Sequence, residues 1–358
     1  MRRTPDLDLS LLLKSLLYRK TQDPDDGKFL YGYARQALED IYRLLELQPG
    51  DGVLYPDYIC DASLAPCHKL NLKVLYYPLR DNLQPDWESL EKLLKDGAKV
   101  VLSVNYFGFP QDLEKWRKIA YQYKVVWIED NAHGYGSQYK GRELGSFGDM
   151  GVSSLRKVLP LLNGAYLHVN EPEYLKRLYS VRLPFSRLRK FPGNEEIRVL
   201  IRWLFQWFGI SFDTFLKRKK YFLMEPCVED DHRHWAIDPI SLCVFALVQN
   251  RLGEYVQKRR SVYKTWENFC VENGLKSVFE QLPSGVSPMV YPCYAKDFEE
   301  QQKWLQWGNK NSVDVYPWPS LPKVVRNQRE SCIQRWRRLL CFPIHQGLDP
   351  EVIRSMRR

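Results

Sequence analysis

The chain has 358 residues, of which 44% are hydrophobic and 27% are charged. This length and apolar content suffice for one large domain and a smaller one, and they exclude an intrinsically disordered chain. The formal net charge of +10 admits three kinds of partner, which are nucleic acid, an anionic membrane surface and acidic small molecules. No zinc-finger, RNA-recognition or basic-zipper pattern accompanies the charge, so we favour phosphorylated small ligands and expect no nucleic acid.

The eight cysteines and the first residues of the chain indicate the cellular compartment of the protein. The cysteines are scattered without CxxC spacing, which predicts reduced thiols in a cytoplasmic protein and no structural metal. Residues 1–20 carry a leucine patch behind a basic start. Acidic residues and a lysine interrupt this patch, and no small-residue cleavage site follows it. We therefore predict an amphipathic helix rather than a signal peptide.

Short apolar runs and helical patterns alternate along the first half of the chain. This alternation predicts an α/β fold with a parallel, doubly wound sheet. Further along, apolar residues at helical spacing predict one long helix over residues 240–260. In chain order, the first half is expected to contain a helical pattern over 28–47 that opens with Gly32, a strand at 53–55, a helix at 61–69, a strand at 73–77, a helix at 87–94, a strand at 100–104, a helix at 113–121, and strands at 125–128 and 151–154.

The stretch of residues 125–166 carries the strongest chemical signal. Its first strand-like run ends in Glu129-Asp130, at the edge where open α/β sheets collect their active-site groups. The second run leads to Lys157 on a loop. Pyridoxal phosphate needs a lysine amine, to hold its aldehyde as a Schiff base, and a carboxylate, to keep its ring nitrogen protonated. Asp130 and Lys157 are the candidates; the alternatives are a strand-end carboxylate that caps a turn and a solvated loop lysine.

Residues 128–154, IEDNAHGYGSQYKGRELGSFGDMGVSS, resemble the DegT/DnrJ/EryC1/StrS family of sugar aminotransferases. The strand-end acid, D-x-A-[QH], YKG and GSFGD signatures of that family occur here in order. The resemblance implies that Asp130 pairs with the ring nitrogen of the cofactor and that Lys157 is the Schiff-base lysine. It further implies that His133 touches the cofactor ring or its O3′ oxygen.

The same resemblance indicates which residues hold the cofactor phosphate. Ser153 or Ser154 takes the place of the serine before the lysine. Ala34 begins the sequence Ala-Arg-Gln-Ala-Leu, which aligns with the G-T-A-A-L start of a family helix whose backbone amides bind phosphate. Arg35 replaces the threonine, and we predict that its guanidinium also binds the phosphate; the alternative is an ordinary surface arginine.

The aromatic residue that stacks on the cofactor in this family has no direct counterpart. The passage from residue 49 to residue 60 resembles the family's PGDEV…P passage and aligns Cys60 with that aromatic position. Tyr58 is the alternative stacking residue, because it lies two positions earlier on the same loop.

The resemblance implies a fold of the aspartate-aminotransferase type, fold type I, with a large domain over residues 1–250 and a smaller α+β domain over residues 251–358. It also implies a homodimer with the active site at the interface. The implied reaction transfers an amino group, from glutamate, to a keto sugar carried by a nucleotide or a lipid, in the synthesis of polysaccharides or cell-surface glycans. A scaffold or regulator without transaminase activity and a sugar dehydratase are the alternatives. Lys157 argues against the dehydratase, because those relatives typically carry histidine there.

A basic and aromatic segment at about residues 180–231 lies outside the resemblance. Within it, residues 197–224 combine an apolar helical face with a lysine-rich end, as in helices that lie on anionic membranes. Burial in a subunit interface or under the small domain is the favoured interpretation, and peripheral membrane contact is the alternative. His232 and His234 stand next to two aspartates, but we favour solvated side chains over a metal site.

Overall fold

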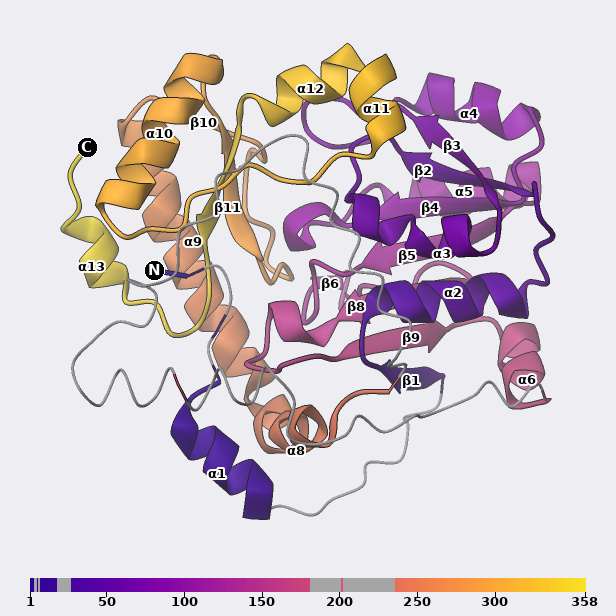
Figure 1. Ribbon diagram of the computed structural model, residues 1–358, viewed down its shortest axis with the longest axis horizontal. Helices are drawn as coiled ribbons and strands as arrows, with labels where there is room; N and C mark the ends of the chain where they lie inside the picture. Colours follow the sequence, from indigo (N-terminus) through magenta and orange to yellow (C-terminus); the bar gives the residue numbers. More distant parts are fainter. Residues whose placement is uncertain (3–4, 6, 18–26, 181–200, 202–235) are drawn as a thin grey trace.

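The computed structural model describes residues 1–2, 5, 7–17, 27–180, 201 and 236–358. The apolar and lysine-rich segment at 197–224 falls outside the described residues except for Ile201, so neither of its two interpretations is tested, and the histidine pair at 232 and 234 falls outside them entirely. Two sheets lie side by side, with helices packed around each of them (Figure 1). No helix in the described part of the chain has the length and apolarity needed to cross a membrane.

A seven-stranded sheet forms the larger body, in the order β1-β9-β8-β5-β4-β2-β3. Its centre is apolar on both faces: all five residues of β4 are buried, as is typical of a strand covered from both sides. The strands are β1 (Lys28–Tyr31), β2 (Gly52–Pro56), β3 (Lys73–Tyr77), β4 (Val100–Val104), β5 (Val126–Asn131), β8 (Met150–Ser154) and β9 (Ala165–Val169).

The sheet is mixed, so the prediction of a purely parallel sheet is wrong in one respect. Strands β3, β2, β4, β5 and β8 run parallel, but β9 is antiparallel to both β8 and β1. The physical reason is the connection between β8 and β9. Residues 155–164 form a short turn and loop without a crossover helix, and a parallel neighbour requires such a crossover.

Helices cover the sheet and pack on it through their apolar faces. Helix α2 packs on β8 and β9, whereas α4 and α5 pack on each other and on β3 and β5. Asp86 and Asp112 cap α4 and α5, accepting hydrogen bonds from the Ser89 and Lys115 amides. These helices and turns are α2 (Ala34–Leu44), η1 (Asp61–Ser63), α3 (Ala65–Lys69), α4 (Trp87–Lys95), η2 (Tyr106–Gly108), α5 (Leu113–Tyr123), η3 (Leu155–Lys157) and α6 (Pro172–Ser180), with a two-stranded ribbon of β6 (Gln138–Tyr139) and β7 (Arg142–Glu143).

The second sheet is antiparallel and three-stranded, in the order β10-β11-β12. Helix α9 packs against it and runs back toward the larger sheet (Figure 1). The elements of this part are α9 (Leu252–Glu272), β10 (Lys276–Ser277), β11 (Val290–Tyr294), α10 (Phe298–Lys310), α11 (Lys323–Gln328), α12 (Glu330–Trp336), β12 (Leu339–Pro343) and α13 (Pro350–Arg354).

The helix predicted over residues 240–260 is two helices. Helix α8 (Pro239–Val248) ends in the turn η5 (Gln249–Arg251), and α9 then continues to Glu272, well past the predicted end. The turn changes the direction of the chain between two packing partners: α8 packs on α1 (Leu9–Leu17), whereas α9 packs on the three-stranded sheet. A straight helix could not reach both partners.

Candidate active site

Strand β5 places two adjacent carboxylates on opposite faces of the seven-stranded sheet. Glu129 is held by the scaffold: its oxygens accept hydrogen bonds from Asn105 Nδ2 and from the Phe147 amide, both at 2.7 Å. Asp130 Oδ1 accepts a hydrogen bond from the Ala132 amide at 2.8 Å, and its Oδ2 accepts none from a described residue. Burial raises the pKa of Asp130, while the Ala132 amide and the positive charge of Lys157 lower it.

Lys157 lies in η3, directly after β8, the strand next to β5. Part of the residue reaches solvent, but burial of its amine lowers its pKa to about 8. Asp130 opposes this shift, Arg156 reinforces it, and Cys60 opposes it. The lysine predicted from the sequence therefore lies within electrostatic reach of the predicted acid, and its amine loses its proton far more readily than a solvated lysine amine.

His133 is neutral, with a proton available for a ligand. Its Nδ1 accepts a hydrogen bond from the Phe107 amide at 3.2 Å, so the one ring proton of the neutral imidazole is assigned to Nε2. Burial, and then the charge of Lys157, hold its pKa well below the ordinary value. Its ring stacks on Phe107 and meets the edge of Trp318, with centroids 5.7 and 4.9 Å away. The imidazole is thus fixed as a hydrogen-bond donor.

The two candidate serines point to opposite faces of β8. Ser153 pairs with Asn131 in the parallel register, and its Oγ lies 3.1 Å from Asn131 Nδ2 and 3.0 Å from His168 Nε2. Asp130 pairs with Val152, so Ser154, two residues on, shares the face of Asp130. Of the two serines left open by the sequence, Ser154 therefore faces the acid, whereas Ser153 belongs to a buried polar network on the other face.

The two candidates for the aromatic position also differ in their surroundings. Tyr58 is fully buried, donates a hydrogen bond to the Trp318 carbonyl oxygen, and has the Arg335 guanidinium 5.2 Å from its ring centroid. It therefore packs the loop after β2 against the C-terminal part of the chain. Cys60 is only half-buried and lies within electrostatic reach of Lys157.

The start of α2 is joined to the lysine turn. Gly164 donates its amide to the Gly32 carbonyl oxygen at 2.8 Å and accepts a hydrogen bond from the Leu155 amide at 3.0 Å. Tyr33 occupies the N-cap position without a side-chain cap, and the Ala34 amide has no acceptor in the part of the chain that the structure describes. The Arg35 guanidinium carbon lies 4.5 Å from the centroid of the Tyr33 ring. The open helix start and Lys157 thus belong to one region.

The loop after the lysine is anchored by side chains. Ser241 Oγ accepts hydrogen bonds from the Leu162 and Asn163 amides at 3.1 and 3.2 Å. Asn163 Oδ1 accepts one from the Asp238 amide at 3.0 Å. Gly164 has φ +140°, which favours glycine. Contacts with the cap of α8 therefore determine the path of this loop.

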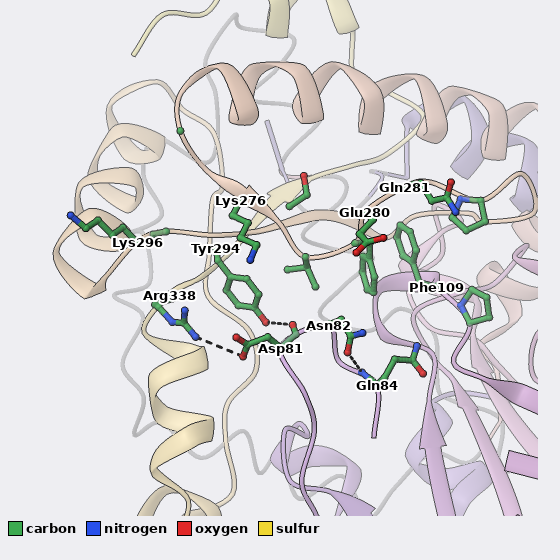
Figure 2. Close-up of a pocket in the computed structure, with 17 residues that line it drawn as sticks. Asp81, Asn82, Gln84, Phe109, Lys276, Glu280, Gln281, Tyr294, Lys296 and Arg338 are labelled. Carbon is green, nitrogen blue, oxygen red and sulfur yellow. Dashed lines mark hydrogen bonds and ion pairs between the residues drawn. The ribbon is translucent and has the colours of Figure 1, made fainter. Parts of the chain in front are cut away.

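A cavity lined by residues outside this group is shown in Figure 2. It has a volume of about 590 Å³ and opens between the loop after β3 and the three-stranded sheet. Phe109 stacks on Phe279 at 3.8 Å, and the Tyr294 hydroxyl donates to the Asp81 carbonyl oxygen at 2.8 Å. None of the predicted site residues lines this cavity. Its size alone does not identify it as the site of the chemistry.

Sequence reasoning missed the aromatic cluster around His133. Trp318 contacts the rings of Tyr58, Tyr106 and Phe107 edge-on, at 5.9, 5.8 and 5.5 Å, in addition to that of His133. No signal in the sequence separates Trp318 from the other ten tryptophans, because its partners lie far away along the chain. The cluster encloses one side of the imidazole and supports its orientation.

The arrangement fits an aromatic aldehyde that bears a phosphate. The acid has an oxygen without a described partner, the lysine has a lowered pKa, the histidine presents an N–H, and a helix start with a neighbouring arginine is open. A metal would need a different donor set: the described residues contain no group of three or more His, Cys, Asp or Glu that could hold one. This donor set therefore matches pyridoxal phosphate in character.

The fold is that of the fold type I pyridoxal-phosphate transferases. Residues 33–187 match the model of the DegT/DnrJ/EryC1/StrS aminotransferase family. The family resemblance and the fold type expected from the sequence are both confirmed.

Two curated relatives and two solved structures illustrate the likeness. The chain is 22% identical over 346 residues, 93% of this chain and 83% of the relative, to dTDP-4-dehydro-2,3,6-trideoxy-D-glucose 4-aminotransferase of Saccharopolyspora spinosa. It is 31% identical over 116 residues, 32% of this chain and 30% of the relative, to UDP-4-amino-4-deoxy-L-arabinose–oxoglutarate aminotransferase of Shewanella sediminis.

Among solved structures, the fold superimposes on PseC of Helicobacter pylori, an aminotransferase involved in the biosynthesis of pseudoaminic acid, with a TM-score of 0.74, 15% identity, and coverage of 98% of this chain and 95% of that chain. It also superimposes on the pyridoxal-phosphate form of the sugar aminotransferase Spr1654 of Streptococcus pneumoniae, with a TM-score of 0.73, 15% identity and the same coverage.

Proposed function

We propose that this protein is a pyridoxal-phosphate-dependent aminotransferase that moves an amino group from glutamate to the keto group of an activated sugar. The observation that carries the proposal is the proximity of the Lys157 amine and the Asp130 carboxylate, after adjacent strands and within the signature of the family. Neither group alone would support it, since strand-end acids and loop lysines are common.

Lys157 and Asp130 take the two central roles. When bound, the cofactor supplies an aldehyde that exchanges amines and a ring that accepts electrons. Lys157 holds the aldehyde, and its pKa of about 8 leaves about a tenth of the free amine neutral at pH 7, so that it can accept and return a proton. Asp130, when ionised, holds the proton on the ring nitrogen. The Nε2–H of His133 would donate a hydrogen bond to the ring oxygen O3′ of the bound cofactor.

The remaining residues hold the phosphate and flank the ring. Ser154 is the preferred serine because it shares the face of Asp130. The Ala34 amide and the Arg35 guanidinium supply further donors at the start of α2. Cys60, rather than the fully buried Tyr58, is the residue of its loop that we place next to the cofactor, where a thiol would take the place of an aromatic lid.

The substrate class follows from the relatives. Their names describe aminotransferases of dTDP- and UDP-linked sugars, and one of them names oxoglutarate, the product of glutamate as donor. A nucleotide-linked keto sugar is therefore our preferred substrate, and a lipid-linked one is the alternative. Amino sugars of this kind serve in polysaccharide and cell-surface glycan synthesis, where we place the reaction.

A homodimer and two domains complete the proposal. The family resemblance supports a dimer with its active site at the interface, and light scattering with and without cofactor tests it. Residues 1–250 form the proposed large domain and residues 251–358 the small one. The separation of the two sheets and the start of α9 at Leu252 support this boundary.

Two measurements test the function. Addition of pyridoxal phosphate to the apoprotein should produce a visible absorption band that survives gel filtration and is lost in Lys157→Ala. Mass spectrometry after incubation with glutamate, cofactor and a panel of nucleotide- and lipid-linked keto sugars should then detect an aminated sugar. A wild-type protein that takes up no cofactor contradicts the proposal and favours a scaffold. Uptake without amination of any sugar in the panel contradicts the assigned substrate class.

A further inference from the structure

The ring of Tyr33 brings together two arginines from distant parts of the chain. The Arg35 guanidinium carbon lies 4.5 Å from the ring centroid and that of Arg156 lies 5.5 Å from it. The sum of these distances limits the separation of the two guanidinium carbons to about 10 Å. Arg156 immediately precedes Lys157, so this pair of cations lies at the lysine end of the site.

The two arginines repel each other unless an anion lies between them. Attraction to the ring explains where each guanidinium rests, but it neutralises neither charge. Arg156 makes no hydrogen bond or ion pair through its guanidinium with any residue that the structure describes, although it is partly buried. A partly buried guanidinium without an acidic partner is suited to bind an anionic ligand.

The backbone holds this pair in place. The Gly32 carbonyl oxygen, one residue before Tyr33, accepts a hydrogen bond from the Gly164 amide at 2.8 Å. The Gly164 carbonyl oxygen in turn accepts one from the Arg156 amide at 3.4 Å. The Tyr33 amide is fixed separately, by Gln36 Oε1 at 3.1 Å. Tyr33 and Arg156 are therefore linked through Gly32 and Gly164.

We propose that Arg156 and Arg35, positioned by the ring of Tyr33, form a clamp for the phosphate monoester of pyridoxal phosphate. The inference rests on the proposed function and adds Arg156 as a phosphate ligand and Tyr33 as a positioning residue. The guanidinium fork matches a phosphate dianion, and two of them neutralise its charge. The location favours this anion over the carboxylates of the donor, because Arg156 is adjacent to Lys157, which would carry the cofactor, and Tyr33 is the N-cap of α2, whose Ala34 amide has no acceptor among the described residues.

The test compares ligands with and without the phosphate. Apoprotein is titrated with pyridoxal phosphate and with pyridoxal, and binding is followed by absorbance and by tryptophan fluorescence. In Arg156→Gln we expect the Kd for pyridoxal phosphate to rise about tenfold or more, while the Kd for pyridoxal stays within about twofold. Inorganic phosphate should compete with pyridoxal phosphate in the wild type and less well in this variant.

Further variants distinguish the effect of the Arg156 charge from that of its guanidinium geometry and from a loss of folding. Arg156→Lys keeps the charge without the fork and should fall between wild type and Arg156→Gln. Tyr33→Phe should bind like wild type, whereas Tyr33→Ala should weaken phosphate-dependent binding. Arg354→Gln removes an equal charge on the exposed helix α13 and should change neither Kd. Circular dichroism and thermal melting verify that each variant folds, and the KM for glutamate should stay unchanged in Arg156→Gln.

The outcomes distinguish this clamp from the function on which it rests. Equal effects of Arg156→Gln on pyridoxal phosphate and pyridoxal, or no effect on either, overturn the clamp while a Lys157-dependent absorption band keeps the function. A rise in the glutamate KM alone would assign Arg156 to the donor carboxylate and also overturn the clamp. A wild-type protein that binds neither compound removes the clamp and the proposed function together.

Discussion

Asp130 and Lys157 reach the same site by different structural routes. Asp130 belongs to β5, which lies in the middle of the seven-stranded sheet and pairs with β4 and β8 along its length. Lys157 belongs to a single turn, whose position depends on Gly164 and on the contacts of Asn163 with the cap of α8. The position of the acid is enforced by the whole sheet and that of the lysine by a few local bonds. Changes near the lysine should therefore alter cofactor binding before they alter the fold.

The largest effect is expected on kcat, from replacement of the strand residue Asp130. In Asp130→Asn the side chain keeps its shape and its bond to the Ala132 amide, but it no longer carries the charge that holds a proton on the cofactor ring. We expect kcat to fall by about 100-fold or more while the melting temperature stays near that of wild type. Steady-state kinetics and calorimetry measure both.

Glu129→Gln is the matched control for Asp130→Asn. This neighbouring carboxylate faces the scaffold and holds Asn105 and Phe147, so its amide variant should lower the free energy of unfolding and leave kcat within a few-fold of wild type. If Glu129→Gln impairs turnover more than Asp130→Asn does, our assignment of the two acids is reversed.

The second effect is a pH dependence of cofactor attachment. The neutral amine of Lys157 attacks the aldehyde, and its pKa is lowered to about 8, so the attachment rate should rise about tenfold per pH unit below pH 8 and level off above it. Stopped-flow absorbance after mixing apoprotein and cofactor provides the profile. A profile still rising above pH 10 would indicate an ordinary solvated lysine.

The same shift has a consequence for the stability of the apoprotein. Between pH 8 and the ordinary lysine pKa of 10.5, the unfolded chain binds more protons at this residue than the folded chain does. The contribution of Lys157 to the free energy of unfolding should therefore increase with pH across this window. Comparison of the wild type with Lys157→Ala in denaturant isolates it.

The third effect tests whether Gly164 holds the turn that carries Lys157. This residue has φ +140°, and an added Cβ would meet Ile237 Cδ1 and Leu161 Cδ1 at 3.3 Å. Gly164→Ala should cost about 1–2 kcal/mol and weaken cofactor binding several-fold, because the turn that carries Lys157 shifts with it. Gly253→Ala, at an open helical position, is the control and should be neutral or slightly stabilising. Unchanged cofactor affinity in Gly164→Ala would show that the turn is held by other contacts.

The smallest effect separates the two serines on the two faces of β8. Ser154→Ala should raise the Kd for pyridoxal phosphate about fivefold without lowering the stability. Ser153→Ala should do the opposite: loss of its hydroxyl leaves Asn131 and His168 without that buried partner, at a cost of about 1–3 kcal/mol, and cofactor affinity stays unchanged. An inverted pattern would assign the phosphate to Ser153.

The sequence pattern predicted the strands and helices well where a whole element packs on the same part of the fold. Strands β2, β3, β4 and β8 and helices α4 and α5 lie within a few residues of their predicted ranges. The exceptions arise where packing decides the path. Strand β1 was absorbed into the helical pattern of residues 28–47, because only its pairing with β9 makes it a strand. The helix predicted at 240–260 breaks because its two halves have different partners.

The sequence by itself predicted the family signature, the acid at 130, the histidine at 133 and the lysine at 157, because a strand end and a short motif encode them within a few dozen residues. Only the tertiary structure showed which serine shares the face of Asp130, that the charge of Cys60 acts on Lys157, and that Arg156 shares the ring of Tyr33 with Arg35. Those features depend on strand register and on contacts between segments that are far apart in the sequence. Sequence periodicity shows that neighbouring side chains of a strand point to opposite faces of the sheet. Which face is next to Asp130 depends on the register with the neighbouring strand.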